Sequence, residues 1–196
     1  MPREKQFDVA AALCAAMETF WAHGFEHTSM EQLLARMGIQ RGSFYDTFGS
    51  KREVLLAALA NYDVSVRRAA LVNAAAGKPP VEGILAVFRA LLDGPTGATA
   101  DNGCLLVNCG LELAARDEAV AAIVRAGLED TRSFFEALVE AGQRDGSIRA
   151  HPPAPLMASI LGNQLVALMV HVRTKAGHTE QRSVLAGVAH LLGRVG

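Results

Sequence analysis

Several features that mark enzymes, secreted scaffolds and membrane proteins are missing from this sequence. Only three of its 196 residues are cysteines, which is too few, and an odd number, for a disulfide framework. Aromatic residues make up 6%, and no segment alternates apolar and polar residues as a half-buried strand does. The formal net charge is -1, so no overall field attracts nucleic acid. We therefore expect reduced thiols, no sheet, and only local nucleic-acid contacts.

Membrane and enzyme signatures are also lacking. The N-terminus, MPREKQFD, is charged where a signal peptide has an apolar core, and no apolar run approaches the ~20 residues of a membrane span. The motifs G-x-S-x-G, H-E-x-x-H and G-x-x-x-x-G-K-S/T do not occur. His23 and His27 have ligand-like spacing, but Gly24 breaks the helix between them and no third ligand is evident. We expect a cytoplasmic protein without membrane contact, catalytic residues, cofactor or metal.

Helical periodicity extends along nearly the whole sequence. Hydrophobic residues make up 51% and charged residues 20%, as in an ordinary globular protein, and alanine and leucine favour helix packing. Apolar residues recur at three- and four-residue steps between glycine and proline stops. The pattern predicts an all-α fold of about nine helices: 7–23, two turns ending at Gly38, 41–48, 51–76, 81–93, 103–115, 117–141, 154–175 and 179–194.

The first three predicted helices are spaced as a helix-turn-helix. The stretch HTSMEQLLARMG begins with a capping box that fits two registers. In the first register Thr28 pairs with Glu31, and in the second Ser29 pairs with Gln32. Gly38 ends the two-turn helix, and the third helix begins three residues later. A helix, a short glycine turn and a second helix form the helix-turn-helix arrangement.

The third predicted helix, RGSFYDTF, has two unlike sides. At ~100° per residue, Phe44 and Phe48 lie one turn apart on one side, whereas Tyr45 points well away from them. The phenylalanines are expected in the core. The remaining surface is polar and mostly short-chained, and it is formed by Gln40, Arg41, Ser43 and Thr47. A narrow buried side opposite a wide polar side suits a helix that contacts a partner.

The stretch from about residue 9 to 62 combines an aromatic pair before Gly24, the Thr28-Ser29 cap, Gly38 in the turn, and the motifs Ser43-Phe44-Tyr45 and Phe48-x-x-Lys51. In this combination it resembles the N-terminal DNA-binding domain of TetR/AcrR-type transcriptional regulators. The resemblance implies a DNA-binding domain at 1–50 and a ligand-binding and dimerisation domain at 51–196, with the fourth helix as connector. It further implies a homodimer that represses at operator DNA and is released by a small-molecule inducer.

The side chains of the third helix agree with contacts to bases. The short side chains of Ser43 and Thr47 let the helix backbone approach base edges. Gln40 and Arg41 can reach hydrogen-bonding groups in the major groove. These four residues are therefore the candidates for reading the operator sequence.

Phosphate contacts are expected around the same helix. Tyr45 offers a rigid hydroxyl, and Lys51 stands where its ammonium and the free N–H groups of the fourth helix can bind one phosphate together. Thr28 and Ser29 can offer the same at the second helix. The alternatives are that Tyr45 is a packed surface tyrosine and Lys51 a solvated lysine. On that reading the chain is a helical regulator that binds protein instead of DNA.

The last two predicted helices have wide apolar stripes. Two long helices at the end of a chain of this family usually form a four-helix dimer interface, and the alternative is that the stripes form the core of one chain. We expect a mixture of both. The stripe residues are Leu156, Ile160, Leu161, Leu165, Leu168, Met169 and Val172 in the first helix, and Val184, Leu185, Val188, Leu191, Leu192 and Val195 in the second.

The middle helices are expected to enclose an apolar cavity for the inducer. Such sites usually have few polar groups, and the candidates for these anchors are Asn108, Asn163, Gln164 and His171. Each of them can equally be a helix-surface group or a satisfied core group. The sequence does not identify the inducer.

The stretch NGCLLVNCGLELA, residues 102–114, resembles a motif in a branch of the family that places Gly-Cys at the start of its sixth helix. In some members that cysteine reacts with electrophiles or oxidants, and Cys104 matches it. Free N–H groups at a helix N-terminus would support a thiolate there, while plain packing is the alternative. Cys109 is an addition of unknown role. It lies about 140° around the helix from Cys104, so the two cannot form a disulfide without unwinding.

Overall fold

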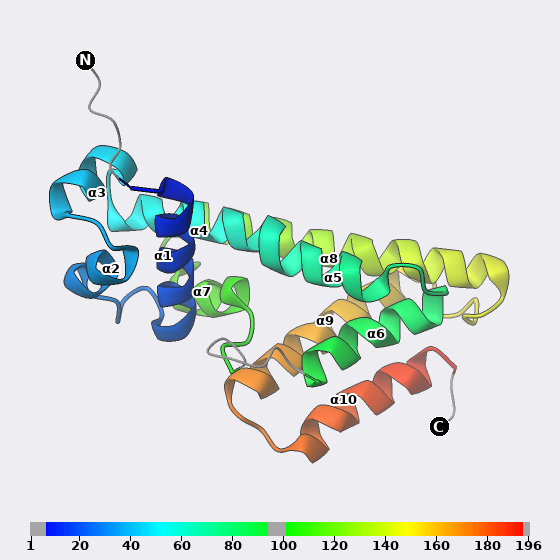
Figure 1. Cartoon of the computed structure of the whole chain (residues 1–196). Coiled ribbons are helices and arrows are strands. Elements are labelled where there is room, and N and C mark those ends of the chain that lie inside the picture. The colour runs from blue at the N-terminus through cyan, green and yellow to red at the C-terminus, as the bar shows by residue number, and fades with distance from the viewer. Residues whose placement is uncertain (1–6, 94–100, 194–196) are drawn as a thin grey trace.

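The computed structural model describes residues 7–93 and 101–193, and throughout these ranges the chain is helical, without a strand (Figure 1). The all-α prediction is therefore confirmed. Three short helices form the N-terminal bundle: α1 Val9–His23, α2 Met30–Met37 and α3 Arg41–Phe48. The remaining elements are α4 Lys51–Tyr62, the π-helical turn Asp63–Arg68, α5 Ala69–Ala75, α6 Pro80–Leu92, α7 Leu105–Leu113, α8 Glu118–Asp145, α9 Ala154–Arg173 and α10 His178–Leu191.

The predicted helix at 51–76 is one rod, but its middle is π-helical rather than α-helical. Helix α4, the π-turn and α5 follow one another without a break, so the described elements number nine when the rod is counted once. In Figure 1 the rod runs beside α8, with the α1–α3 bundle at one end and α10 towards the other. Helix α8 continues four residues beyond its predicted end at 141. The predicted end of the last helix, at 194, lies outside the described residues.

The helix-turn-helix prediction is confirmed by its local geometry. Ser29 caps α2 by accepting a 3.1 Å hydrogen bond from the N–H of Gln32, so the chain uses the second of the two capping registers. Gly38 has φ +67°, the left-handed conformation that glycine adopts without strain, and it ends α2. Ile39 then turns inward and is 8% exposed. The turn between α2 and α3 is therefore fixed by one glycine and one buried side chain.

The two predicted sides of α3 are also present. Phe44 is completely buried and packs edge-to-face on Tyr45, with ring centroids 5.3 Å apart. The ring of Phe48 lies 5.8 Å from that of Phe44 on the core side. Tyr45 is 46% exposed, so it combines a packed ring with a free hydroxyl end. Helix α3 thus has a rigid attachment to the bundle and an outward polar surface.

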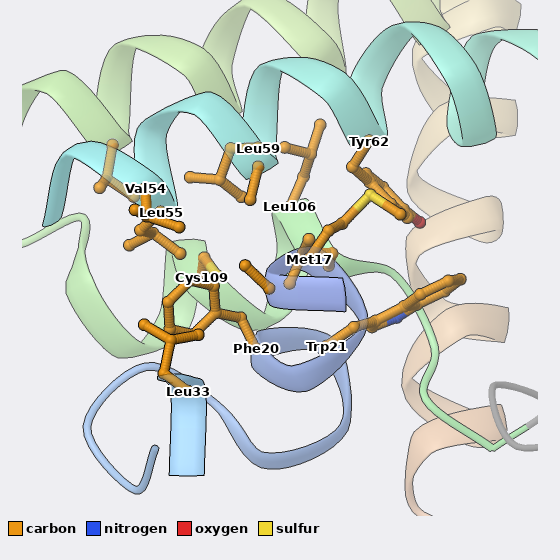
Figure 2. Packing of buried hydrophobic residues seen from close by; sticks show 14 of the residues in the cluster. Met17, Phe20, Trp21, Leu33, Val54, Leu55, Leu59, Tyr62, Leu106 and Cys109 are labelled. Carbon is orange, nitrogen blue, oxygen red and sulfur yellow. The ribbon is translucent and has the colours of Figure 1, made fainter. Parts of the chain in front are cut away.

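Buried residues form two hydrophobic clusters, and the division between these clusters does not coincide with the predicted domain boundary after residue 50. The first cluster joins α1–α4 to α7 and the start of α8, as the close-up in Figure 2 shows around Phe20, Leu59 and Leu106. The second joins α5, α6, most of α8, α9 and α10. The predicted boundary between residues 50 and 51 stays a prediction. Helix α7, which follows Cys104, shares its core with the N-terminal bundle.

Helix α9 differs from the expectation that no segment reaches membrane length. It has 20 residues with a hydropathy of 1.5 in its most apolar window, and by length and composition it could span a bilayer. The helix instead packs against α8 and α10, and it contains Asn163, Gln164 and His171. Only 28% of that window is buried within one chain, so α9 has an apolar side that α8 and α10 leave uncovered.

Candidate functional site

The predicted base-reading residues gather on the outward surface of α3. Gln40 is the N-cap of α3, but its side chain makes no capping hydrogen bond and stays exposed. Arg41 is exposed, and Ser43 and Thr47 are half-buried beside it. Because Phe44 fixes the opposite side, these four side chains and Tyr45 are presented together without competing for the core. This surface has the composition that hydrogen-bonded readout in a major groove requires.

The two predicted phosphate ligands at α2 have different environments. Ser29 is exposed at the N-terminus of the helix, where a bound anion would meet free N–H groups. Thr28 is completely buried, and its hydroxyl donates a 2.6 Å hydrogen bond to the carbonyl of Gly24. The prediction for the Thr28 side chain is therefore wrong, because that side chain has no surface to offer DNA. The Thr28 hydroxyl instead closes the α1–α2 turn by donating to the carbonyl of Gly24.

Lys51 is bound within the chain. Its ammonium donates a 2.6 Å hydrogen bond to the carbonyl of Phe25 and lies 4.3 Å from the centroid of that ring. Burial lowers the pKa of Lys51, while the nearby carboxylates of Glu26 and Glu112 oppose that shift. The predicted phosphate contact must therefore compete with an internal cation–π and hydrogen-bond site. In this structure Lys51 ties the start of α4 to the α1–α2 turn.

The same turn is bound by Glu112 near the end of α7. Its two carboxylate oxygens accept hydrogen bonds from the N–H groups of Phe25, at 3.1 Å, and Glu26, at 2.7 Å. Gly24 makes the approach possible, since a Cβ added there would lie 3.1 Å from Oε2 of Glu112 and its φ is +82°. Nothing in the sequence indicated Glu112. A carboxylate on one helix is linked to two backbone amides 86 and 87 residues away only by the tertiary fold.

A second contact joins the rod to the start of α8. Arg52 makes a bidentate pair with Asp117, with nitrogen–oxygen distances of 2.5 and 2.8 Å. The hydrogen bond from Arg52 lowers the pKa of Asp117 to about 2. Asp117 also caps α8 by accepting from the N–H groups of Ala119 and Val120. Since the pair is at the surface, its role is to set the position of α4 and α8 rather than to add much stability.

An apolar cavity of about 540 Å³ lies beside the middle of the rod and is lined by residues of α1, α6 and α9 as well as of the rod itself. It is the size of a small-molecule site, and most of its wall is hydrophobic. Its charged lining residues are Glu18 and Arg67. The apolar wall is formed by Met17, Trp21, Tyr62, Val66, Ala70, Leu71, Val87, Ala90, Leu91, Leu165, Met169 and Val172, with Gly103 at one end.

Cys104 lies just behind that end of the cavity. It is 6% exposed and is the N-cap of α7, where its side chain makes no capping hydrogen bond. Tyr62, which lines the cavity, hydrogen-bonds with the Cys104 side chain and accepts from the N–H of Leu105. Burial and the contact with Cys104 raise the pKa of Tyr62, so its hydroxyl stays protonated. Two residues of the cavity wall are therefore neighbours of the thiol: Tyr62 contacts it, and Gly103 precedes Cys104 in the sequence.

The backbone conformation and close packing at residue 103 explain why the first position of the Gly-Cys motif is a glycine. Its φ is +64°, and an added Cβ would lie 2.9 Å from the carbonyl oxygen of Met169. Its own carbonyl accepts a 3.1 Å hydrogen bond from the indole N–H of Trp21. Only glycine fits between α1 and α9 in this conformation. The position of Cys104 relative to the cavity thus depends on a residue without a side chain.

The other two cysteines have ordinary environments, and all three thiols are free. Cys109 is completely buried on α7 among Phe20, Leu33 and Leu55 in the packing view of Figure 2. Burial, with smaller contributions from Glu112 and Cys104, raises the pKa of Cys109 to about 12. It is therefore an uncharged packing group at neutral pH, while Cys14 is exposed on α1.

None of the four predicted polar anchors lines the cavity. Asn108 supports the loop before α7 by donating a 2.9 Å hydrogen bond to the carbonyl of Asn102. Asn163 is exposed on α9, and Gln164 is half-buried. His171 is half-buried too, and its Nδ1 has no partner among the described residues. Sequence spacing identified polar groups on the right helices but not the direction in which each points, which depends on how the helices pack.

The cavity residues that the sequence analysis missed are Trp21, Tyr62 and Arg67. Trp21 lies in the apolar repeat of the first helix, and a core position and a cavity wall have the same periodicity. Arg67 is only 9% exposed because it pairs with Asp63 at 2.5 Å and Asp130 at 2.7 Å. The i, i+4 spacing of Asp63 and Arg67 was a readable signal, whereas Asp130 on α8 was not.

Comparison with known proteins gives matches along most of the chain. Residues 12–58 match the family described as "Bacterial regulatory proteins, tetR family", and residues 80–186 match "Tetracyclin repressor-like, C-terminal domain". The uncharacterized HTH-type transcriptional regulator YezE of Bacillus subtilis is 32% identical over 62% of this chain and 62% of its own length. The HTH-type transcriptional repressor ComR of Escherichia coli is 34% identical over 54% of this chain. The match spans 51% of ComR, so both relatives are covered over less than two thirds of their length.

A solved structure is similar over the full chain. It is a cysteine mutant of CifR, a TetR family transcriptional regulator, in complex with 26-bp double-strand operator DNA. The two folds have a TM-score of 0.81 and 27% sequence identity, and the similarity covers 100% of both chains. The arrangement of the helix-turn-helix and the C-terminal helices is thus the same in both proteins.

The Glu112 contact generates a prediction about stability. Glu112→Ala should lower the free energy of unfolding by about 1–2 kcal/mol, because two backbone amides lose their acceptor. Glu112→Gln keeps one oxygen acceptor and should lose less. The measurement is urea unfolding followed by circular dichroism, with Glu140→Ala at an exposed site on α8 as the matched control. Equal unfolding midpoints for Glu112→Ala and Glu140→Ala would show that the contact does not stabilise the fold.

Proposed function

Because the chain belongs to the TetR family of bacterial regulatory proteins, we propose that this transcriptional regulator is a homodimeric repressor that leaves operator DNA when its ligand site is occupied. The observation that carries the proposal is the outward polar surface of α3 above the buried Phe44. We propose that it acts in the cytoplasm, where operator DNA is accessible. CifR in its DNA complex supports this proposal by similarity of fold.

Helix α3 would enter the major groove with its exposed side. Gln40 and Arg41 would hydrogen-bond base edges, and the short Ser43 and Thr47 would permit close approach. Tyr45, Ser29 and Lys51 would contact phosphates on either side. Since the chain has a net charge of -1, binding depends on few phosphate contacts and on the presence of two subunits.

The DNA proposal predicts different effects for the two kinds of contact. Tyr45→Phe keeps the packed ring, removes the hydroxyl and should weaken binding to every DNA sequence about three- to tenfold, while Gln40→Ala should change the preferred bases. Asp46→Asn is the opposite control, because removing an exposed acid from α3 should strengthen binding. Gel retardation at several salt concentrations measures each. A Tyr45→Phe, Lys51→Ala double variant that binds like wild type at moderate salt would reject this docking.

Absence of retardation at any salt concentration would favour the alternative function. In that case the outward surface of α3 would be a protein contact, and the chain a helical regulator that acts without DNA. Pull-down with operator-containing and random duplexes separates the two functions. Binding to duplex that falls as salt rises supports the repressor.

We propose that the dimer forms through the uncovered sides of α9 and α10. Leu156 is 52% exposed and Val170 39% exposed on α9, and an added Cβ at Gly187 on α10 would meet nothing within 4 Å. An apolar side with small residues permits two helix pairs to approach closely. Leu168 is completely buried in its own chain, so it is a core residue and not a probe of this interface.

Charge on this side should separate the subunits. Val170→Glu should produce monomers, because dimerisation would bury an unpaired carboxylate, and the monomers should lose most operator affinity. Val64→Glu is the matched control on the rod, where Val64 is 67% exposed. Light scattering gives the mass of each variant. A Val170→Glu protein that stays dimeric would place the interface elsewhere.

Release from DNA is proposed to begin at the cavity or at Cys104. An electrophile with a conjugated carbonyl would enter beside Tyr62, the sulfur would bond to its β-carbon, and the thiol proton would pass to the α-carbon through solvent. Cys104 stands at the N-terminus of α7 and contacts the Tyr62 hydroxyl, so the helix dipole and that hydroxyl would stabilise the charge that develops on sulfur. Reaction with an oxidant such as a peroxide is the second route left open by the sequence, and a reversible ligand in the cavity is the third.

The thiol proposal predicts selective release. N-ethylmaleimide should release operator from the wild type as an adduct forms at Cys104, and Cys104→Ser should stay bound. Cys14 reacts in both proteins because it is exposed, so Cys14→Ser serves as the background. Cys109 should react far more slowly than Cys14, because it is completely buried and burial raises its pKa to about 12. Full modification of Cys104 with operator still bound would leave the reversible ligand as the inducer.

A further inference from the structure

Part of the cavity wall is formed by rings and thioethers, while the rest of its apolar surface is aliphatic. The rings of Trp21 and Tyr62 meet edge-to-face with centroids 5.0 Å apart. The indole N–H of Trp21 is already used on the carbonyl of Gly103, so the ring offers its apolar surface. Met17 and Met169 add thioethers, which make favourable contacts with aromatic rings. These groups suit a flat aromatic molecule better than an aliphatic chain or a sugar.

The positive residue in the wall is not available to bind an anion. Arg67 directs three of its donors to Asp63 at 2.5 Å, to Asp130 at 2.7 Å and to the Thr131 hydroxyl at 2.7 Å. Arg68 pairs with Asp130 as well, at 3.0 Å. Two carboxylates and two guanidinium groups therefore balance one another around Arg67. A carboxylate ligand would have to displace Asp63 or Asp130 to pair with Arg67.

The negative residue in the wall is unpaired. Glu18 lines the cavity from α1, is exposed, and makes no ion pair within the described part of the chain. With the Arg67 cluster balanced, Glu18 leaves the cavity mouth with one net negative charge. An aromatic wall beside a carboxylate also attracts a cation through the ring quadrupole. Charge and wall chemistry thus favour the same kind of molecule.

We propose that the cavity binds a flat aromatic compound that carries a single positive charge facing Glu18. This inference rests on the proposed ligand response, since it names the chemical class of the inducer at the same site. The aromatic body would lie against Trp21, Tyr62 and Met169, and the charged end would lie at the exposed mouth. An anion of equal shape is disfavoured, because its charge would lie beside the carboxylate of Glu18 with no free cation in the wall to pair with it.

The test uses three biphenyl compounds of one shape: biphenyl-methylamine, biphenyl-methanol and biphenyl-carboxylate. Trp21 is the single tryptophan of the chain, so selective excitation reports occupation of the cavity directly. At low salt the amine should bind at least tenfold more tightly than the carboxylate, with the alcohol between them. Glu18→Gln should weaken binding of the amine about two- to fivefold, which is the ratio expected for one exposed charge pair. The affinity for the alcohol should not change.

Two variants on α5 locate the binding. Ala70 lines the cavity, so Ala70→Phe should fill it and abolish quenching by all three compounds. Val72→Phe on the same helix is the control, because Val72 is 50% exposed and not part of the wall. Quenching that persists in Ala70→Phe would mean that the compounds bind elsewhere, and the proposal would then be wrong.

Three results would overturn the ligand class: no quenching by the amine, a carboxylate that binds as tightly as the amine, or an amine affinity unaffected by Glu18→Gln. Operator retardation on the same samples keeps this proposal distinct from the proposed function. If the amine binds in the cavity without releasing operator, the ligand class stands and the inducer response fails. If the carboxylate binds and releases operator, the response stands and the ligand class fails.

Discussion

The carboxylate of Glu112 joins α7, which begins beside the cavity, to the turn before the helix-turn-helix. It accepts the N–H groups of Phe25 and Glu26 in the turn before α2, and Gly24 leaves the space for it. Helix α7, which carries Glu112, begins at Cys104 beside the cavity. We propose that this short helix moves as a unit, so that a displacement at its N-terminus would reach the turn. Because Ser29 caps α2 just after that turn, the helix-turn-helix would then shift as well.

The rod of α4, the π-turn and α5 supplies a second connection between the N-terminal bundle and the rest of the chain. Its first turn binds the α1–α2 turn through Lys51 and α8 through the pair of Arg52 with Asp117. The hydrogen bond from Arg52 lowers the pKa of Asp117 to about 2, so this pair is present at neutral pH and is lost only as the pH falls towards that value. The middle of the rod is fixed to α8 through Arg67 and Asp130. A ligand beside Arg67 would therefore act on the rod and on α8 together.

The parts of the fold that depend on neighbouring residues could be predicted from the sequence. Caps, glycine stops and the alternating sides of α3 follow from spacing alone, and Phe44 and Tyr45 lie as expected. Side-chain partners across helices could not be predicted. Thr28 had the spacing of a helix cap, yet packing buries it, and Lys51 binds the carbonyl of Phe25 from 26 residues away. The same limit applies to the cavity, because periodicity does not distinguish a filled core from a hollow one.

Amide hydrogen exchange at Phe25 and Glu26 measures most directly whether α7 connects the two sides. The protein is compared with and without an N-ethylmaleimide adduct at Cys104, in a Cys14→Ser background, with Glu112→Ala as the reference for a released turn. The account predicts that the adduct raises exchange at these two amides towards the Glu112→Ala rate, while the amide of Phe44 in α3 keeps its protection. Operator release with unchanged exchange at Phe25 and Glu26 would contradict it.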